Sequence, residues 1–306
     1  MLEVCLLGTG GMVPLPKRHL TSLMVRYNGH NILIDCGDGT QVAIKKKGWS
    51  PYPIDLILFT HYHADHISGL PGLLLTLGNC ERTEPLYIAG PSGLERIVNA
   101  LRVISPQLPY EIRYIEYSDP LEVFQHKDFY IRAFRVNHRV ECYGYRIDIK
   151  RKGRFQVEAA KALGLECRYW GMLQRGETVE IDGKVYTPDM VMGEERRGLS
   201  LVYCTDTRPT KRIEEEAADV DLFICEGMYG EEEKDANAKK HKHMTMREAA
   251  VLASRAKPRR MWYTHYSPAN MNPKQYEAEM KKIYDKVQVA RDGWSVDLKF
   301  DGEEEE

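Results

Sequence analysis

Three histidines and an aspartate stand within six residues, in the stretch His61-Tyr-His63-Ala-Asp65-His66. Imidazole nitrogens and carboxylate oxygens are ligands that suit Zn²⁺, and a site built from them can leave room for a water molecule. With further ligands from elsewhere, this stretch can hold two adjacent divalent metals. A pair of metals about 3.5–4 Å apart can share a hydroxide and bind a phosphoryl oxygen, so hydrolytic chemistry is expected.

Further ligand-type side chains follow apolar runs along the chain. The runs at 54–60, 129–136, 199–205 and 261–264 are rich in β-branched and aromatic residues and predict strands. Because open α/β sheets carry their chemistry at the carboxyl ends of strands, we expect the side chains that follow these runs to converge. The expected ligands are His61, His63, Asp65, His66, His138, Asp206 and His265. Asp206 stands alone after its strand, and a carboxylate in that position suits a bridge between two metals.

This pattern resembles the metallo-β-lactamase superfamily over nearly the whole chain. The opening segments Val4-Cys-Leu-Leu-Gly-Thr-Gly-Gly11 and Ile32-Leu-Ile-Asp35-Cys-Gly37 match it as well. The resemblance implies an α/β (α+β) fold, a four-layer αββα sandwich with two metals at one edge of its sheets. By the same resemblance, the first metal takes His61, His63 and His138, the second takes Asp65, His66 and His265, and Asp206 bridges them.

Within that superfamily the chain is most similar to the ribonuclease Z family, which removes 3′ trailers from tRNA precursors. The segment 14–22 resembles the substrate loop of that family, although Pro16 replaces a lysine and His19 an asparagine. This likeness suggests Lys17 and Arg18 as substrate contacts. The segments Ile224-Cys-Glu226-Gly-Met and His243-Met-Thr245 resemble two further family motifs, in which His243 would protonate the leaving 3′ oxygen and Glu226 would orient it. The family often has an arginine four or five residues after His265, where this chain has Ala269 and Asn270.

The same roles suit phosphodiester cleavage in general, which needs a nucleophile, charge neutralisation and a protonated leaving group. Asp65 could accept the proton of the attacking water while it ligates a metal. His243 is the candidate general acid because histidine titrates near neutral pH. The alternative for His243 is a solvated histidine in the polar stretch 239–243, the reading we prefer for His241. Glu226 could instead form a salt bridge or cap a helix.

A basic segment interrupts the alternation of strands and helices. Residues 150–176 contain seven Lys or Arg residues and two Glu residues, although the net charge of the chain is −2. A local basic patch attracts polyanions even when the whole chain is acidic. The family resemblance implies a tRNA-binding arm here, at about 150–197, inserted into one catalytic domain that spans 1–306. The expected phosphate contacts of this arm are Arg151, Lys152, Arg154, Arg168 and Arg175. Tyr169 and Trp170 could stack on RNA or pack on protein.

Composition fits a globular enzyme of 306 residues with 43% hydrophobic and 29% charged residues. No apolar stretch approaches the roughly 20 residues of a membrane helix, and no signal peptide is visible. The seven cysteines include no Cys-x-x-Cys motif, and most lie in apolar runs. We therefore expect a cytoplasmic protein without a membrane partner, whose cysteines are core residues. The family resemblance also implies a homodimer.

Several other elements are predicted from local signals. Helices are expected at 92–104, at 157–163, after a capping box of Thr245 and Glu248, and from Pro273 through Val287. No strand is expected between Gly164 and Leu199.

Three functions compete at this point. The leading one is a Zn²⁺-dependent endoribonuclease that removes 3′ trailers from precursor tRNA by hydroxide attack and leaves a 3′-hydroxyl. The second is a binuclear hydrolase of small phosphodiesters or sulfate esters, and the third is a metal-binding RNA protein without turnover. The complete ligand set with His243 and Glu226 favours an enzyme. Mn²⁺ or Fe²⁺ could occupy the same ligands.

Overall fold

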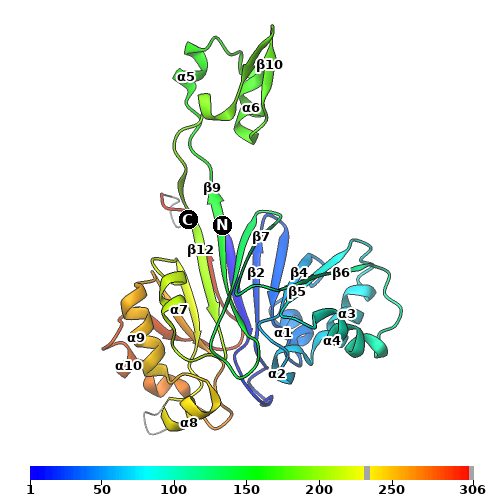
Figure 1. Cartoon of the computed structure of the whole chain (residues 1–306), viewed down its shortest axis with the longest axis vertical. Helices are drawn as coiled ribbons and strands as arrows, with labels where there is room; N and C mark the ends of the chain where they lie inside the picture. The colour runs from blue at the N-terminus through cyan, green and yellow to red at the C-terminus, as the bar shows by residue number, and fades with distance from the viewer. Residues whose placement is uncertain (231–234, 303–306) are drawn as a thin grey trace. The chain divides into compact units, whose positions relative to one another are not determined.

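Two large β-sheets form the framework of the molecule (Figure 1). The computed structural model describes residues 1–230 and 235–302, and within these ranges it contains two seven-stranded sheets and a two-stranded hairpin. The chain divides into two compact units. One unit comprises Met1–Asp148 and Ser200–Lys299, and the other comprises Ile149–Leu199 with the chain from Phe300 onward. The predicted arm at 150–197 falls within the second unit.

The first sheet combines an antiparallel half with a parallel half. In spatial order its strands are β16 (Trp294–Leu298), β1 (Leu2–Gly8), β2 (Ser22–Tyr27), β3 (His30–Ile34), β4 (Ile54–Leu58), β5 (Leu86–Gly90) and β6 (Ile112–Glu116). Strands β3 to β6 pair in parallel, so their carboxyl ends lie at one edge. The segment that carries three of the expected histidines follows β4 at this edge.

The second sheet repeats this plan. In spatial order its strands are β15 (Val287–Val289), β14 (Met261–Thr264), β13 (Leu222–Glu226), β12 (Arg196–Cys204), β9 (Tyr143–Arg151), β8 (Phe129–Arg135) and β7 (Leu121–His126). Strands β12 to β15 are parallel. Asp206 and His265 therefore stand just beyond the carboxyl ends of parallel strands, as predicted from the apolar runs, and Glu226 stands at the end of β13 between them.

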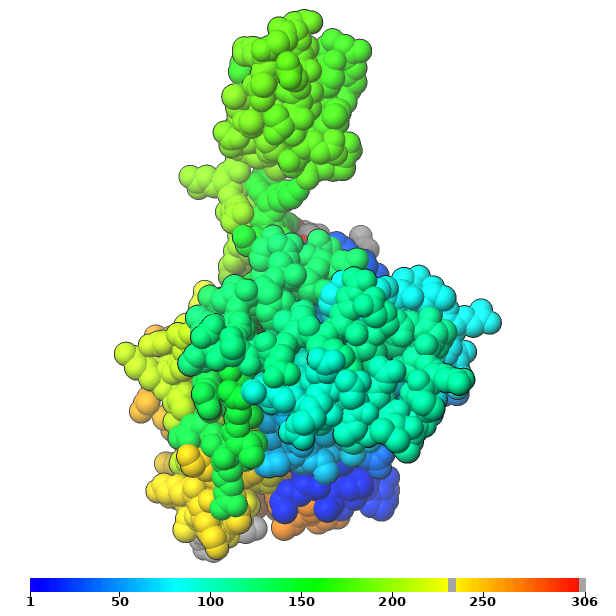
Figure 2. All heavy atoms as spheres, turned by 45° about the vertical axis from the view of Figure 1, so that its right-hand side comes forward, coloured from blue at the N-terminus to red at the C-terminus, as the bar shows by residue number. Residues whose placement is uncertain are grey.

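Helices cover the outer face of each sheet in the first unit. The helices beside the first sheet are α1 (Thr40–Lys46), α2 (Ala64–Ile67), α3 (Leu70–Asn79) and α4 (Leu94–Leu101), which continues into η1 (Arg102–Ile104). Apolar side chains of these helices pack against that sheet. The surface of this part of the molecule is blue to teal in Figure 2. Those beside the second sheet are α7 (Lys211–Glu216), α9 (Met246–Ala256), η4 (Pro273–Tyr276) and α10 (Glu277–Met280). Helix α8 (Asp235–His241) ends just before His243. The order helix, sheet, sheet, helix confirms the expected αββα sandwich (Figure 1).

The second unit has a small apolar core of its own. It contains α5 (Val157–Ala162), α6 (Cys167–Arg175), η2 (Pro188–Met190) and a hairpin of β10 (Val179–Ile181) and β11 (Lys184–Tyr186). Ala160, Leu173 and Val191 are fully buried in this core. Trp170 packs on Phe155 at a ring distance of 5.4 Å and donates its indole N–H to the carbonyl of Leu165. Packing within the unit is therefore the role that the structure gives to Trp170.

Two local predictions are wrong. The helix expected from Pro273 through Val287 is shorter than predicted: η4 and α10 end at Met280, and the carboxylate of Glu277 accepts the N–H of Val289 at 2.8 Å, which joins α10 to β15. The hairpin of β10 and β11 was not expected. Its turn, Asp182-Gly183, has positive φ at both residues, the conformation that makes Asp-Gly a strong hairpin signal.

The capping box before α9 is confirmed. The Thr245 hydroxyl accepts the N–H of Glu248, and the Glu248 carboxylate accepts the N–H of Thr245 at 3.0 Å. The expected helix at 92–104 is present as α4 and η1, and that at 157–163 as α5. Five of the seven cysteines are buried thiols, and Cys167 is exposed. Within the described ranges, no helix has the length and apolar character required to span a bilayer.

Candidate metal centre and general acid

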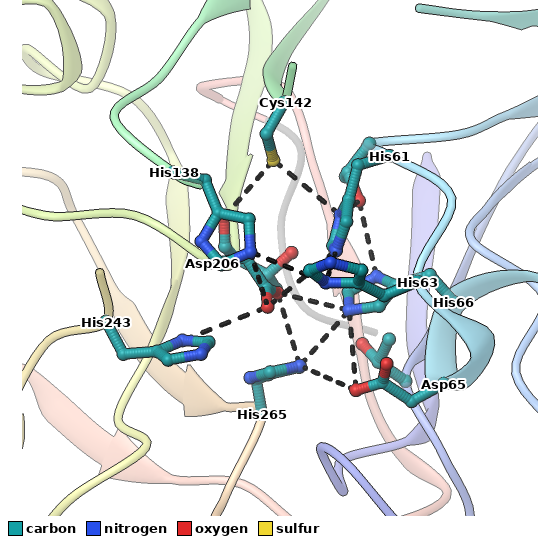
Figure 3. A network of polar contacts seen from close by, with 12 residues as sticks. His61, His63, Asp65, His66, His138, Cys142, Asp206, His243 and His265 are labelled. Carbon is teal, nitrogen blue, oxygen red and sulfur yellow. Dashed lines mark hydrogen bonds and ion pairs between the residues drawn. The ribbon is translucent and has the colours of Figure 1, made fainter. Parts of the chain in front are cut away.

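The seven expected ligands converge on one place in the first unit (Figure 3). His61 follows β4, His138 follows β8, Asp206 follows β12 and His265 follows β14. His63, Asp65 and His66 come from the loop after β4 and from the short helix α2. The ring nitrogens and carboxylate oxygens fall into groups whose atoms lie within 4.8 Å of one another.

The first group consists of His61, His63, His138 and Asp206. Nε2 of His61 lies 2.8 Å from Nδ1 of His63, and Nε2 of His138 lies 3.4 Å from the same Nδ1 atom. Both Nε2 atoms are 3.9 Å from Oδ1 of Asp206. Two imidazoles thus turn a nitrogen toward the same carboxylate oxygen, and the third, His63, lies against both of them.

The second group consists of Asp65, His66 and His265. The Nε2 atoms of His66 and His265 lie 3.2 Å apart, and Oδ2 of Asp65 is 3.7 and 3.4 Å from them. Asp206 reaches this group through its other oxygen, Oδ2, which lies 3.1 Å from His66 Nε2 and 3.2 Å from His265 Nε2. Asp206 therefore faces both groups, one with each carboxylate oxygen.

The backbone at three of these strand ends has a left-handed conformation. The φ angles are 59° at Asp35, 52° at Asp206 and 57° at His265. Positive φ is uncommon outside glycine and persists where surrounding structure holds it, often at functional sites. Gly11 is required for a different reason, because a Cβ atom there would lie 2.7 Å from the ring of His265.

Asp35 supports the centre from behind, and sequence reasoning assigned it no role. Its Oδ2 lies 2.8 Å from Nδ1 of His66, and its Oδ1 accepts the N–H of Thr60 at 2.9 Å. A carboxylate behind a ligating histidine fixes the ring tautomer, so that Nε2 keeps its lone pair toward the centre. The signal was present, since Asp35 directly follows the apolar strand β3.

A bound cation would neutralise the negative charge of the buried carboxylates in this cluster. Asp206 is buried, and its Oδ2 atom accepts no hydrogen bond from the described residues. Asp35 and Asp65 are buried as well, and buried carboxylates require compensation by positive charge. Imidazole nitrogens and carboxylate oxygens at these spacings are a suitable donor set for divalent transition metals. The donor set therefore fits metal ions.

The protonation states of three histidines agree with this fit. Burial lowers the pKa of His61, His63 and His138, which favours the neutral imidazole that metal binding requires. The pKa of His66 is raised instead, because the negative charges of Asp206 and Asp35 outweigh its burial. A proton on His66 and a bound cation are alternative ways to neutralise the same carboxylates. Burial also opposes the charge of Asp65, but His265 and His66 outweigh it and lower the pKa of Asp65.

His243 lies beside the cluster of expected ligands (Figure 3), and Glu226 pairs with its ring. Nδ1 of His243 lies 3.1 Å from Oε2 of Glu226 and 3.8 Å from Oδ1 of Asp206. Glu226 is fully buried. Burial lowers the pKa of His243, but the charges of Glu226 and Asp206 outweigh it and raise this pKa to about 9. Near neutral pH His243 therefore carries the proton that a general acid needs.

Arg208 is a second residue that sequence reasoning missed. Its Nη1 atom donates to the carbonyl of His243 at 2.6 Å and to Oε2 of Glu248 at 3.0 Å, and Nη2 also pairs with Glu248. The N–H of Thr207, the preceding residue, donates to Oε1 of Glu226 at 2.5 Å. The segment after Asp206 thus holds both the carboxylate of Glu226 and the backbone of His243. Only proximity in space reveals this role.

The expected substrate contacts have varied surroundings. Arg18 donates to the carbonyls of Ser267, Asn270 and Met271, whereas Lys17 borders two open cavities. In the second unit, Arg151 donates to the backbone carbonyl of Asp301, and Lys152 donates to that of Arg175. Arg168 pairs with the carboxylate of Glu166, and Arg175 pairs with that of Glu177. Arg154 is exposed. The structure therefore places Arg18 against the segment that follows His265. The substrate-contact roles of all these residues stay predictions.

Comparison with known proteins identifies the family. The metallo-beta-lactamase superfamily model matches residues 17–140, and a beta-lactamase superfamily domain model matches residues 188–266. Ribonuclease Z of Lachnospira eligens is 58% identical over 303 residues, which cover 99% of this chain and 100% of that protein. The chain belongs to the ribonuclease Z family. Ribonuclease Z of Clostridium acetobutylicum is 47% identical, with coverage of 95% of this chain and 96% of the relative.

Solved structures agree on the fold of this ribonuclease Z family member. Human tRNase Z, short form, superposes with a TM-score of 0.70 at 22% identity and covers 97% of this chain and 100% of its own. The metallo-beta-lactamase fold protein YhfI from Bacillus subtilis superposes with a TM-score of 0.69 at 18% identity, covering 96% of this chain and 98% of its own. The expected family and fold are confirmed. The fold and the His/Asp cluster together indicate a metal-dependent hydrolase that binds a divalent metal.

Proposed function

We propose that this chain is a Zn²⁺-dependent endoribonuclease that removes 3′ trailers from precursor tRNA and leaves a 3′-hydroxyl on the tRNA. The geometry that carries the proposal is the placement of His243 against the metal ligands, oriented by Glu226 at 3.1 Å. A ribose 3′ oxygen is a poor leaving group without a proton, so its departure calls for a positioned general acid. The full-length similarity to proteins named Ribonuclease Z supports the same reaction.

Two Zn²⁺ ions are proposed, one held by His61, His63 and His138 and the other by Asp65, His66 and His265, with Asp206 shared. Mn²⁺ or Fe²⁺ suits the same ligands. When bound, such a metal pair makes a water nucleophile available at neutral pH and neutralises phosphoryl charge.

The side chains of this chain supply the remaining steps. Asp65 is held by the N–H of Met12, which donates to its Oδ2 at 2.7 Å, and it accepts a hydrogen bond from the attacking water. His243 donates its proton to the 3′ oxygen as the phosphorus–oxygen bond breaks. Glu226 stabilises the protonated ring before transfer and keeps its orientation afterwards.

We further propose that the second unit is an arm that binds precursor tRNA, inserted into a single catalytic domain. Its basic residues Arg151, Lys152, Arg154, Arg168 and Arg175 would contact phosphates, which makes binding weaker as salt rises. The core formed around Leu173 supports this proposal, because it gives the basic residues a folded scaffold. We also propose that the protein is cytoplasmic, which the buried free thiols support. We propose in addition that it forms a homodimer, as the family resemblance implies.

The test is cleavage of a 3′-extended precursor tRNA by the purified protein with Zn²⁺ or Mn²⁺, with the cut site mapped. A cut directly after the unpaired nucleotide that ends the acceptor stem, lost on adding a chelator, supports the proposal. Hydrolysis of bis(p-nitrophenyl) phosphate without RNA cleavage would overturn it and indicate a hydrolase of small phosphodiesters. Light scattering of the same preparation measures the oligomeric state.

A further inference from the structure

A polar cavity of about 270 Å³ lies beside the catalytic cluster. Its walls come from the segments that follow Glu226 and His265, at 228–230 and 267–276. Residues that line it include Met228, Tyr229, Ser267, Asn270, Gln275 and Tyr276. A water molecule occupies about 30 Å³ in the liquid, so the cavity has the volume of roughly nine waters. It is therefore large enough for a small planar ligand.

Asn270 is one of the residues that line this cavity, and its carboxamide has no hydrogen-bond partner among the described residues. Its residue is only 8% exposed, and neither Nδ2 nor Oδ1 bonds to any residue that the structure describes. Buried amide groups are nearly always paired, and an unpaired one calls for an explanation such as a missing ligand or water. A carboxamide presents a donor and an acceptor side by side, which matches the edge of a nucleobase.

The wall that carries Asn270 is held in place by other contacts. Arg18 donates to the carbonyls of Ser267, Asn270 and Met271 at 3.4, 3.0 and 3.2 Å. The N–H of Ser267 donates to the carbonyl of Met228 at 3.1 Å, which joins the two walls. These bonds preorganise the cavity, so a ligand would not have to order the loop on binding.

The cavity lies on the side of the cluster where the general acid acts. The ring of Tyr229 packs edge-on against the ring of His243 at 6.5 Å between centroids. The N–H of Met246 donates to the carbonyl of Tyr229 at 2.8 Å, which ties this wall to the segment that follows His243. In the proposed reaction His243 protonates the 3′ oxygen of the nucleotide before the cut. A nucleotide whose 3′ oxygen reaches His243 therefore lies on the same side of the cluster as this cavity.

We propose that this cavity binds the base of the unpaired nucleotide immediately 5′ of the cut, and that the Asn270 carboxamide reads it. The inference rests on the proposed function and adds a specificity site to it. Asparagine pairs with adenine through one donated and one accepted hydrogen bond, so adenine is the favoured base. Tyr229 and Tyr276 supply aromatic surface, on which unpaired RNA bases stack.

The experiment compares four precursor tRNAs that differ only in the nucleotide before the cut. With the wild-type protein, kcat/KM for adenine should exceed that for the poorest base by roughly 5- to 150-fold, the range for one two-bond contact. Asn270→Ala should bring the four values together while hydrolysis of bis(p-nitrophenyl) phosphate is unchanged. Asn79→Ala, at an exposed asparagine near the end of α3, is the control and should keep the preference.

Asn270→Asp is a second variant, because it keeps the shape of the side chain while it replaces the donor with an acceptor and adds a negative charge. It should also lose the preference for adenine. A wild-type protein without base preference, or an Asn270→Ala variant that keeps the preference, would overturn the proposal and indicate that water fills the cavity. A protein that hydrolyses bis(p-nitrophenyl) phosphate but cleaves no RNA would instead remove the proposed function, and this inference with it.

Discussion

Glu226 and His243 are joined by a hydrogen bond of 3.1 Å between Oε2 and Nδ1, although 16 residues separate them in the chain. The same Oε2 atom accepts the N–H of Met244 at 3.1 Å, and Oε1 accepts the N–H of Thr207. One buried carboxylate thus fixes the ring of His243, the backbone next to it and the segment that follows Asp206. The ring of His243 is therefore held by the same framework that holds the segment after Asp206.

Replacing His243 should separate chemistry from metal binding. His243→Ala is expected to lower kcat for precursor tRNA by about 10²- to 10⁴-fold, the usual contribution of a general acid. Metal content should not change, because the seven proposed ligands remain. Hydrolysis of bis(p-nitrophenyl) phosphate should fall much less, since p-nitrophenolate leaves without a proton. Unaltered turnover of precursor tRNA would exclude His243 as the acid.

Removing the charge of Glu226 should shift the pH profile. The pKa of His243 is about 9 because carboxylates outweigh burial, so its protonated form prevails below that pH. In Glu226→Gln the burial remains and one carboxylate is lost, so this pKa falls. The alkaline limb of kcat/KM should move to lower pH by about 1 to 3 units. An unchanged limb would mean that another group titrates there.

Replacing one histidine of the cluster should deplete the metal. His63→Ala removes a nitrogen that lies within 3.4 Å of both His61 and His138 Nε2 atoms. Metal bound per protein, measured by elemental analysis, should fall together with activity, and a chelator should reproduce the loss in the wild-type protein. His241→Ala, two residues before His243, is the control and should keep full metal content. A metal-depleted variant with wild-type activity would contradict the proposed centre.

Arg208 should act through His243. Arg208→Gln removes the donor to the His243 carbonyl at 2.6 Å and is expected to lower kcat for RNA by roughly 10- to 100-fold, as for other side chains that orient a functional group. Arg208→Lys keeps the charge but not the planar fork, so it should rescue little. Arg113→Gln, at an exposed ion pair with Glu111, is the control. Equal losses on RNA and bis(p-nitrophenyl) phosphate would point to a general structural role instead.

Deleting residues 155–176 should impair RNA cleavage selectively. The deleted segment belongs to the second unit, which has its own apolar core, so the metal centre in the first unit should survive. Cleavage of precursor tRNA should fall far more than hydrolysis of bis(p-nitrophenyl) phosphate. A charge variant, Arg154→Glu with Arg168→Glu, should weaken tRNA binding and flatten its salt dependence. Equal losses on both substrates would argue against an RNA-binding arm.

Local signals predicted much of the fold. The strands before His61, His138, Asp206 and His265 were expected because each is a short run of apolar and β-branched residues. The helix after Thr245 was expected from its capping box, which depends on residues three apart. The helix predicted through Val287 is shorter than expected, and the carboxylate of Glu277 within it bonds to the N–H of Val289 in β15. That bond has no local signature.

The sequence by itself determined which side chains could ligate metals, since four of them lie within six residues and the others follow strands. It also determined where they meet, because the carboxyl ends of neighbouring parallel strands share one edge. The tertiary structure alone decided that Arg18 holds the loop of Asn270, some 250 residues away, and that Arg208 bonds to the carbonyl of His243. These contacts depend on which segments become neighbours in space. The packing of the two sheets brings those segments together, so a local pattern of residue types does not predict these contacts.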